Sequence, residues 1–184
     1  MKGVVFTEFL EMVEAQFSSE MVEELLGSCE LASGGAYTSI GTYDHRELVA
    51  LVGALSEKTG APGGALVHEF GRHLLRRFTV GFPGFFAAAR DTFAFLAQVE
   101  GYVHAEVRKL YPDAELPTFE CRVDGHDRMD MVYRSTRGFA DLAHGLIVAT
   151  AEHYGEAITV EVEDLSGGAR THVRFELRKR GAAE

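Results

Sequence analysis

The segment Tyr133-Arg134-Ser135-Thr136-Arg137 holds the side chains with the clearest capacity for chemistry in this chain. Tyr133, Ser135 and Arg137 recur at every second position, so all three point to the same side if the segment is extended. Two hydroxyl groups and a guanidinium group suit a pair of carboxylates or phosphates, because Arg binds such groups bidentately. The alternative is an ordinary solvated strand face, and the segment alone does not decide between the two.

Two further residues precede this segment. His104 lies near the end of a predicted helix, where it is either a core histidine hydrogen-bonded to a neighbour or an axial metal ligand held rigidly by the helix. Pro117 lies between that helix and the first predicted strand, where a proline helps to begin a strand. Because His104 and Pro117 precede the Tyr133–Arg137 segment in this order, we favour a ligand site over a solvated strand face.

These residues resemble the haem nitric oxide/oxygen binding (H-NOX) family, whose motif Tyr-x-Ser-x-Arg matches residues 133–137. The other matching pieces follow in the family's order and spacing, and the resemblance covers essentially the whole chain. These pieces are Met1-Lys2-Gly3, Val103-His104-Ala105, Leu116-Pro117-Thr118-Phe119-Glu120-Cys121 and Gly145-Leu146-Ile147.

The resemblance implies a cofactor and a role for each residue. The cofactor is haem b (protoporphyrin IX iron), and His104 is the proximal iron ligand. Tyr133, Ser135 and Arg137 then clamp the two haem propionates, since buried carboxylates require strong donors. Pro117 presses on the haem and holds it out of planarity, for which its rigid ring is suited.

The distal side is expected to select the gas. Oxygen-binding members of the family place a tyrosine hydroxyl over the iron, and an alignment without gaps puts Leu142 at that position. The resemblance predicts a dry distal pocket formed by Val5, Phe9, Leu74, Phe78, Leu142 and Leu146. Nitric oxide should bind there, and carbon monoxide more weakly. Oxygen should be excluded, because the pocket offers it no hydrogen-bond donor. His73 and His144 are the alternative distal donors.

Composition limits the partners. The chain has 18 basic and 28 acidic residues and a net charge of −10, which disfavours nucleic acid and anionic membranes. No apolar run approaches the roughly 20 residues that span a bilayer. The two distant cysteines, Cys29 and Cys121, form neither a zinc motif nor a disulfide framework, and they predict a reduced, cytoplasmic protein.

The elements that position these residues change character along the chain. Helical spacing predicts helices over 4–17, 18–27, 44–60, 62–82 and 84–110, and again over 138–154. Alternation and turn residues predict strands over 118–123, 128–135, 158–163 and 173–177, with a polar, frayed tail from Arg178. We therefore expect one α+β domain over 1–184. Its helical part (about 1–112) packs on a sheet-containing part (about 113–180), an antiparallel four-stranded sheet with one helix, and haem lies between them.

One apparent metal motif is excluded. His68-Glu69-Phe70-Gly71-Arg72-His73 has one residue more than the zinc-protease pattern His-Glu-x-x-His. Histidines five apart on a helix diverge by roughly 140° and do not share one metal easily. The segment is expected to be an exposed helix face.

The expected function is that of a gas sensor, not an enzyme. The resemblance implies that nitric oxide weakens the iron–histidine bond, which shifts the helix around His104 and changes a surface read by a partner. It implies a histidine kinase or a diguanylate cyclase or phosphodiesterase as that partner, acting in trans because no fused domain is seen. The alternative from another class is a haem enzyme, either a peroxidase or a nitric oxide dioxygenase. Such an enzyme needs a polar distal acid–base group.

Overall fold

The core of the C-terminal part is an antiparallel sheet with the strand order β1-β2-β4-β3. The structure, a computed structural model, describes residues 1–180. The strands are β1 (Thr118–Asp124), β2 (Arg128–Arg134), β3 (Ile158–Asp164) and β4 (His172–Lys179). Burial alternates along β2 and β4, as the period of a half-buried strand requires. Buried side chains of β2 and β4 therefore line one face of the sheet: Met129, Met131, Tyr133, Val173, Phe175 and Leu177.

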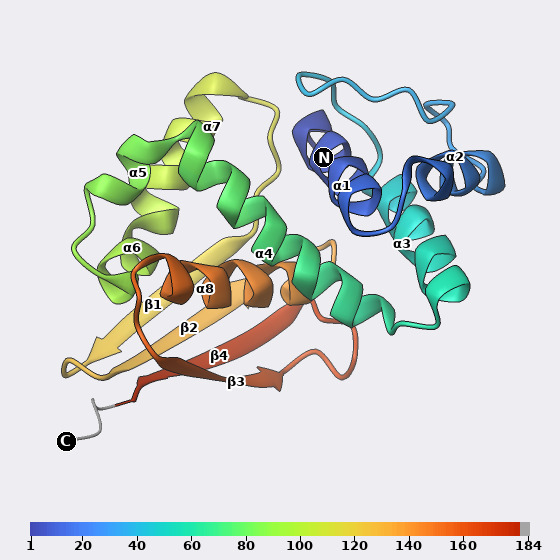
Figure 1. Ribbon diagram of the computed structural model, residues 1–184. Coiled ribbons are helices and arrows are strands. Elements are labelled where there is room, and N and C mark those ends of the chain that lie inside the picture. The colour runs from blue at the N-terminus through green and yellow to red at the C-terminus, as the bar shows by residue number, and fades with distance from the viewer. Residues whose placement is uncertain (181–184) are drawn as a thin grey trace.

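Helix α8 (Ala140–His153) lies on this apolar face, and α4 (Gly63–Gly81) crosses over α8 (Figure 1). The crossing is close because two glycines meet there. A Cβ at Gly145 would lie 2.0 Å from the carbonyl oxygen of His68, and one at Gly71 would lie 2.3 Å from that of Leu142. These glycines allow direct backbone contact between α4 and α8.

The N-terminal part consists of α1 (Gly3–Gln16), α2 (Ser19–Ser28) and α3 (His45–Thr59), which pack around the N-terminal half of α4. Ser18 and Asp44 cap α2 and α3 by accepting hydrogen bonds from backbone N–H groups. These helices enclose a hydrophobic core separate from the core on the sheet, and Phe78 and Leu146 contact both. The structure confirms the predicted α+β fold.

The predicted helix over 84–110 is wrong as a single element. It is divided into α5 (Pro83–Ala87), α6 (Thr92–Gln98), a π-helical segment η1 (Val99–Val103) and α7 (His104–Leu110). Asp91 begins α6 as an N-cap, because its side chain accepts a hydrogen bond from the N–H of Ala94. The N–H of His104 bonds to the carbonyl of Val99, five residues earlier, so η1 leads directly into His104.

The predicted fraying from Arg178 is also wrong in part, because β4 continues to Lys179, which pairs with Ile158. The rest of that predicted tail, 181–184, lies outside the described residues.

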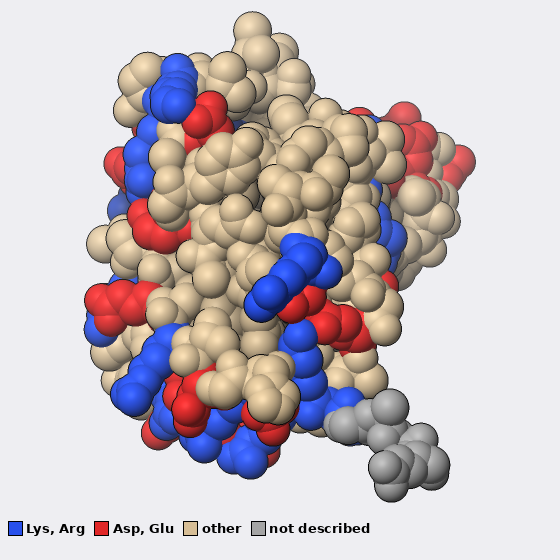
Figure 2. Space-filling view, turned by 90° about the vertical axis from the view of Figure 1, so that its left-hand side faces the viewer, with Lys and Arg blue, Asp and Glu red and all other residues tan. Residues whose placement is uncertain are grey.

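Figure 2 shows the side of the molecule that bears α5 to α7, and much of its surface carries no charged group. Val80 and Phe82, at the junction of α4 and α5, are 78% and 48% exposed. Over 1–180, no helix has both the length and the apolar character needed to cross a membrane.

Candidate functional site

The hydroxyl groups of Tyr133 and Ser135 retain donors for a ligand. The side chain of Tyr133, at the end of β2, is buried, and its Oη accepts a hydrogen bond of 3.1 Å from the N–H of Phe139. Ser135 Oγ accepts one of 3.2 Å from the N–H of Arg137. Both oxygens use acceptor capacity on the backbone, so both O–H groups can donate to a bound anion. Burial raises the pKa of Tyr133, which keeps its hydroxyl protonated.

The guanidinium group of Arg137 already binds a carboxylate in this structure. It donates to the side chain of Glu115 and, at 3.2 Å, to the Glu115 carbonyl oxygen. The Arg137 side chain is only 14% exposed, whereas that of Glu115 is 75% exposed. Both residues border a pocket of about 440 Å³, together with Leu116, Arg134, Ser135 and Thr136. The site thus has the chemistry to hold a carboxylate, and the exposed Glu115 can move aside for one.

His104 is held by an acidic residue that the sequence did not single out. Its Nδ1 lies 3.0 Å from Oε2 of Glu100, which also accepts a hydrogen bond from the N–H of Phe119, while Oε1 accepts one from Arg108. Burial lowers the pKa of His104, an effect that Glu100 opposes and Arg108 reinforces. Burial by itself would raise the pKa of Glu100, but the hydrogen bonds from His104 and Arg108 bring it below its usual value. The result is a neutral imidazole beside an ionised carboxylate.

Phe119 connects His104 to the Tyr133–Arg137 segment. Its ring centroid lies 5.7 Å from that of His104 and 5.7 Å from that of Tyr133, its partner in the β1–β2 register. Pro117 is half-buried in the loop two residues before Phe119. The structure therefore brings the predicted proximal residues to one region at the start of β1 and the end of β2.

The six predicted distal residues also come together, but in the other core. Phe9 and Leu74 are buried there, and the remaining four pack against it: Val5, Phe78, Leu142 and Leu146. Tyr133 belongs to the core on the sheet, and Phe119 and Val103 pack against it. Phe78 and Leu146 contact both cores. The predicted proximal and distal sets thus lie on the two sides of the boundary between the cores.

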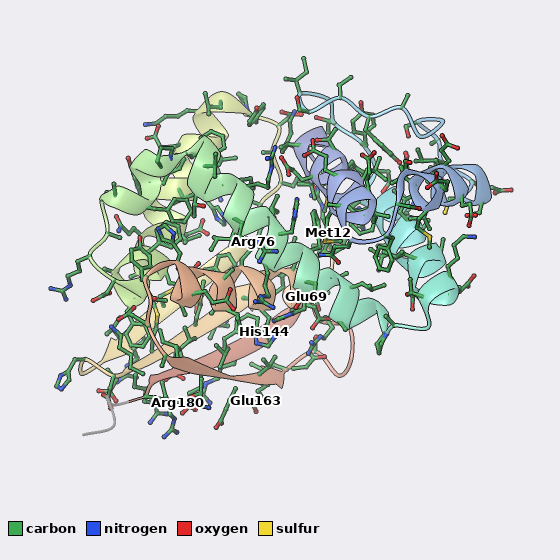
Figure 3. All side chains as sticks on the ribbon, viewed as in Figure 1. Met12, Glu69, Arg76, His144, Glu163 and Arg180 are labelled. Atoms are coloured by element: carbon green, nitrogen blue, oxygen red, sulfur yellow. The ribbon has the colours of Figure 1, made fainter. Side chains whose placement is uncertain are left out.

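The two alternative distal donors are engaged elsewhere. His73 Nε2 lies 3.3 Å from Oε2 of Glu8, which also accepts a hydrogen bond of 2.9 Å from Arg77. His144, labelled in Figure 3, belongs to α8. Its ring centroid lies 4.6 Å from that of His68 of α4 and 5.9 Å from that of Phe175 of the sheet. Burial lowers the pKa of His144 to about 4, and the positive charge that His68 can carry adds to this.

The prediction of an exposed face over residues 68–73 is wrong. This segment lies at the α4–α8 crossing, and the side chains of His68 and His73 are 25% and 17% exposed. The segment was predicted to be exposed, but the glycine contact brings α8 against the backbone of His68. Across residues 1–180 no group of three or more His, Cys, Asp or Glu side chains is placed to hold a metal ion.

The residues present fit a haem. Glu100 occupies Nδ1 of His104, and among the described residues none forms a hydrogen bond with Nε2, which remains as the nitrogen for iron. Arg137 demonstrates carboxylate binding through Glu115, and Tyr133 and Ser135 supply further donors. The other side chains around these residues are apolar, as the ring system of a haem requires.

Glu100, Glu115 and Phe119 are the site residues that sequence reasoning missed. Only the spacing of Glu100 four residues before His104 was a usable signal.

A family model described as haem-NO-binding matches residues 2–162. No curated protein matches the chain. Solved structures similar to this chain include an Fe(II) unliganded H-NOX protein from K. algicida, with 36% identity and a TM-score of 0.95 over 100% of this chain and 99% of that one.

Two further solved structures show other ligation states. An H-NOX protein from Shewanella woodyi in the Fe(II)CO state, bound to IWP-051, has 39% identity and a TM-score of 0.84, with 100% of this chain and 97% of that one covered. An H-NOX protein from S. oneidensis in the Fe(II)NO state has 23% identity and a TM-score of 0.90, with 98% and 99% covered. At that lower identity the similarity shows the fold.

Proposed function

This chain belongs to the haem-NO-binding (H-NOX) family of haem-based gas sensors, and we propose that it binds haem b through His104 and senses nitric oxide. The observation that carries the proposal is the state of His104. Its side chain is 11% exposed, its Nδ1 is engaged by Glu100, and its Nε2 is left for iron. With Nδ1 held by Glu100, Nε2 of His104 is the ring nitrogen that can coordinate a metal.

The residues have distinct roles in this proposal. His104 would ligate the haem iron, and Tyr133, Ser135 and Arg137 would bind the propionates. A bound haem would supply the iron at which nitric oxide coordinates. Glu100, which bonds to both His104 and the N–H of Phe119, would couple the position of His104 to η1, α7 and β1. Pro117, in the loop before β1, would contact the haem.

The distal residues support nitric oxide and carbon monoxide as ligands, with oxygen excluded. Oxygen coordinated to iron carries partial negative charge and is stabilised by a hydrogen-bond donor. The predicted distal side chains supply no hydrogen-bond donor, and they form an apolar site, which nitric oxide tolerates. These side chains are Val5, Phe9, Leu74, Phe78, Leu142 and Leu146. His73 is bonded to Glu8, and His144 packs against the ring of His68, so neither is a member of the apolar distal set. This argues against the haem-enzyme alternative.

The partner belongs to the same proposal. We propose that residues 1–184 act as one sensor domain that regulates a histidine kinase, diguanylate cyclase or phosphodiesterase. A cytoplasmic location is likewise part of the proposal, because both cysteines are free thiols among the described residues.

An absorption spectrum of the protein expressed with haem tests the proposal. We expect a Soret band, a spectral change with nitric oxide and with carbon monoxide, and none on adding oxygen to the reduced protein. His104→Gly should lose haem unless free imidazole is supplied, whereas His126→Gly, in the exposed β1–β2 turn, should keep it. Absence of a Soret band overturns haem binding. A stable oxygen complex overturns the distal assignment.

A further inference from the structure

Glu100 is a carboxylate that joins three parts of the proximal side. Its Oε2 lies 3.0 Å from Nδ1 of His104 and 3.3 Å from the N–H of Phe119, and its Oε1 lies 3.1 Å from Nη2 of Arg108. The Glu100 side chain is 33% exposed and that of His104 is 11% exposed. A carboxylate with three donors around it has little freedom to turn away.

The chemistry of Glu100 fixes the tautomer of His104. An ionised carboxylate only accepts hydrogen bonds, so Nδ1 of His104 must carry the proton and donate it. The lone pair is then on Nε2, the nitrogen that remains for a metal. A charged acceptor on the far nitrogen also raises the basicity of an imidazole ligand more than a neutral carbonyl does.

The π-helical segment places Glu100 where it can do this. Glu100 lies inside η1, and His104 begins α7, so the two residues are four apart across the change from π to α geometry. The hydrogen bond to Phe119 shows that Glu100 faces β1 rather than solvent alone. Because π segments are rare and concentrate at functional sites, this placement is unlike an ordinary surface pair on a helix.

We propose that Glu100 is a positioning residue for the proximal ligand, which holds the imidazole of His104 in one orientation and strengthens its bond to the haem iron. This inference rests on the proposed haem site. A stronger bond resists cleavage, so Glu100 sets how readily His104 is released when nitric oxide binds. The link from Glu100 to Phe119 also couples the position of His104 to the strand that follows Pro117.

The test compares Glu100→Gln with Glu106→Gln in the haem-loaded protein. The first variant keeps the side-chain length and removes the charge. The second removes the same charge on α7, where Glu106 pairs with Lys109 at 2.5 Å. The readouts are the iron–histidine stretching band in the resonance Raman spectrum of the reduced protein, the haem midpoint potential, and the rate of haem loss.

We expect Glu100→Gln to lower the frequency of the iron–histidine band, to raise the midpoint potential and to accelerate haem loss about ten- to a hundred-fold. Glu106→Gln should match the wild type in all three. A purely structural role for Glu100 would alter the melting temperature without moving the Raman band. If the Glu100→Gln protein fails to fold, Glu100→Asp, which keeps the charge but shortens the side chain, should show a smaller shift in the same direction.

An unchanged Raman band in the folded Glu100 variants overturns this inference. Absence of haem from the wild type instead overturns the proposed function, so the two failures are distinguishable. Arg108→Gln separates the contributions of the two charged partners. It should leave the band near its wild-type position, because Nδ1 of His104 still donates to the Glu100 carboxylate.

Discussion

Replacement of Arg137 by alanine should weaken haem retention, and the structure sets the size of the effect. A hydrogen bond to a charged group contributes about 1.5–3 kcal/mol. In this structure, however, Arg137 binds Glu115, whose side chain is 75% exposed. A pair that exposed contributes about 0.2–1 kcal/mol, which a propionate must displace. The net contribution of Arg137 is then about 0.5–2.8 kcal/mol, or roughly two- to a hundred-fold in haem affinity.

Transfer of haem to an excess of a high-affinity apoprotein measures this effect as a dissociation rate. Arg134→Ala is the matched control. It borders the same pocket, but its side chain is 45% exposed and pairs with Glu120 at 2.7 Å on the strand face. Arg137→Lys should fall between the wild type and Arg137→Ala, since lysine keeps the charge without the planar fork. Equal rates for Arg137→Ala and Arg134→Ala would refute the propionate assignment.

Three further changes test other parts of the structure. Leu142→Tyr should raise oxygen affinity about ten- to a hundred-fold through one new hydrogen bond, measured by oxygen titration of the reduced protein. Leu142→Phe, which lacks the hydroxyl, should not, and equal affinities would contradict the distal alignment. Gly145→Ala should lower the free energy of unfolding in urea by about 1–3 kcal/mol, because its Cβ would meet a backbone oxygen at 2.0 Å. Gly53→Ala, with nothing within 4 Å, should be neutral or stabilising, and the same loss at both sites would contradict the close crossing. Acid should also destabilise the protein through His144, whose pKa of about 4 when folded lies below 6.5. Because the unfolded chain then binds more protons, stability should fall as the pH drops from about 6.5 to about 4, by up to about 3 kcal/mol. His144→Phe should flatten this urea–pH profile, and an unchanged slope would contradict the assignment.

The strands and turns were predictable because their signals are local. The Asp124-Gly125-His126-Asp127 turn joins β1 and β2 as expected, and Gly125 has a φ of 65°, which favours glycine. The side of β2 that Tyr133 takes was left open by the sequence, and in the structure it is the buried one. The N-cap at Asp91 was also present in the sequence, but the apolar pattern on either side of it suggested a continuous helix.

Other features depend on tertiary contacts that no local pattern contains. The π-helical segment before His104 cannot be distinguished from α-helix by residue type, since its hydrogen bonds differ only by one position. Glu115 lies in the loop after α7, where there is no periodicity to show that it faces Arg137. Likewise, residues 68–73 were predicted to be exposed. The contact of Gly71 with Gly145, from helices far apart in the sequence, brings α8 against this segment.

The division of the apolar interior into two cores affects how this protein unfolds. Phe78 and Leu146 contact both cores, and they lie on α4 and α8, the two helices that cross at Gly71 and Gly145. A macrocycle bound at that boundary would bury apolar surface from both halves at once, and it would stabilise them together by mass action. Without it, we expect amide exchange to separate α1–α3 from the sheet as two units of different stability. Cofactor binding would thus make two folding units of different stability unfold as a single cooperative one.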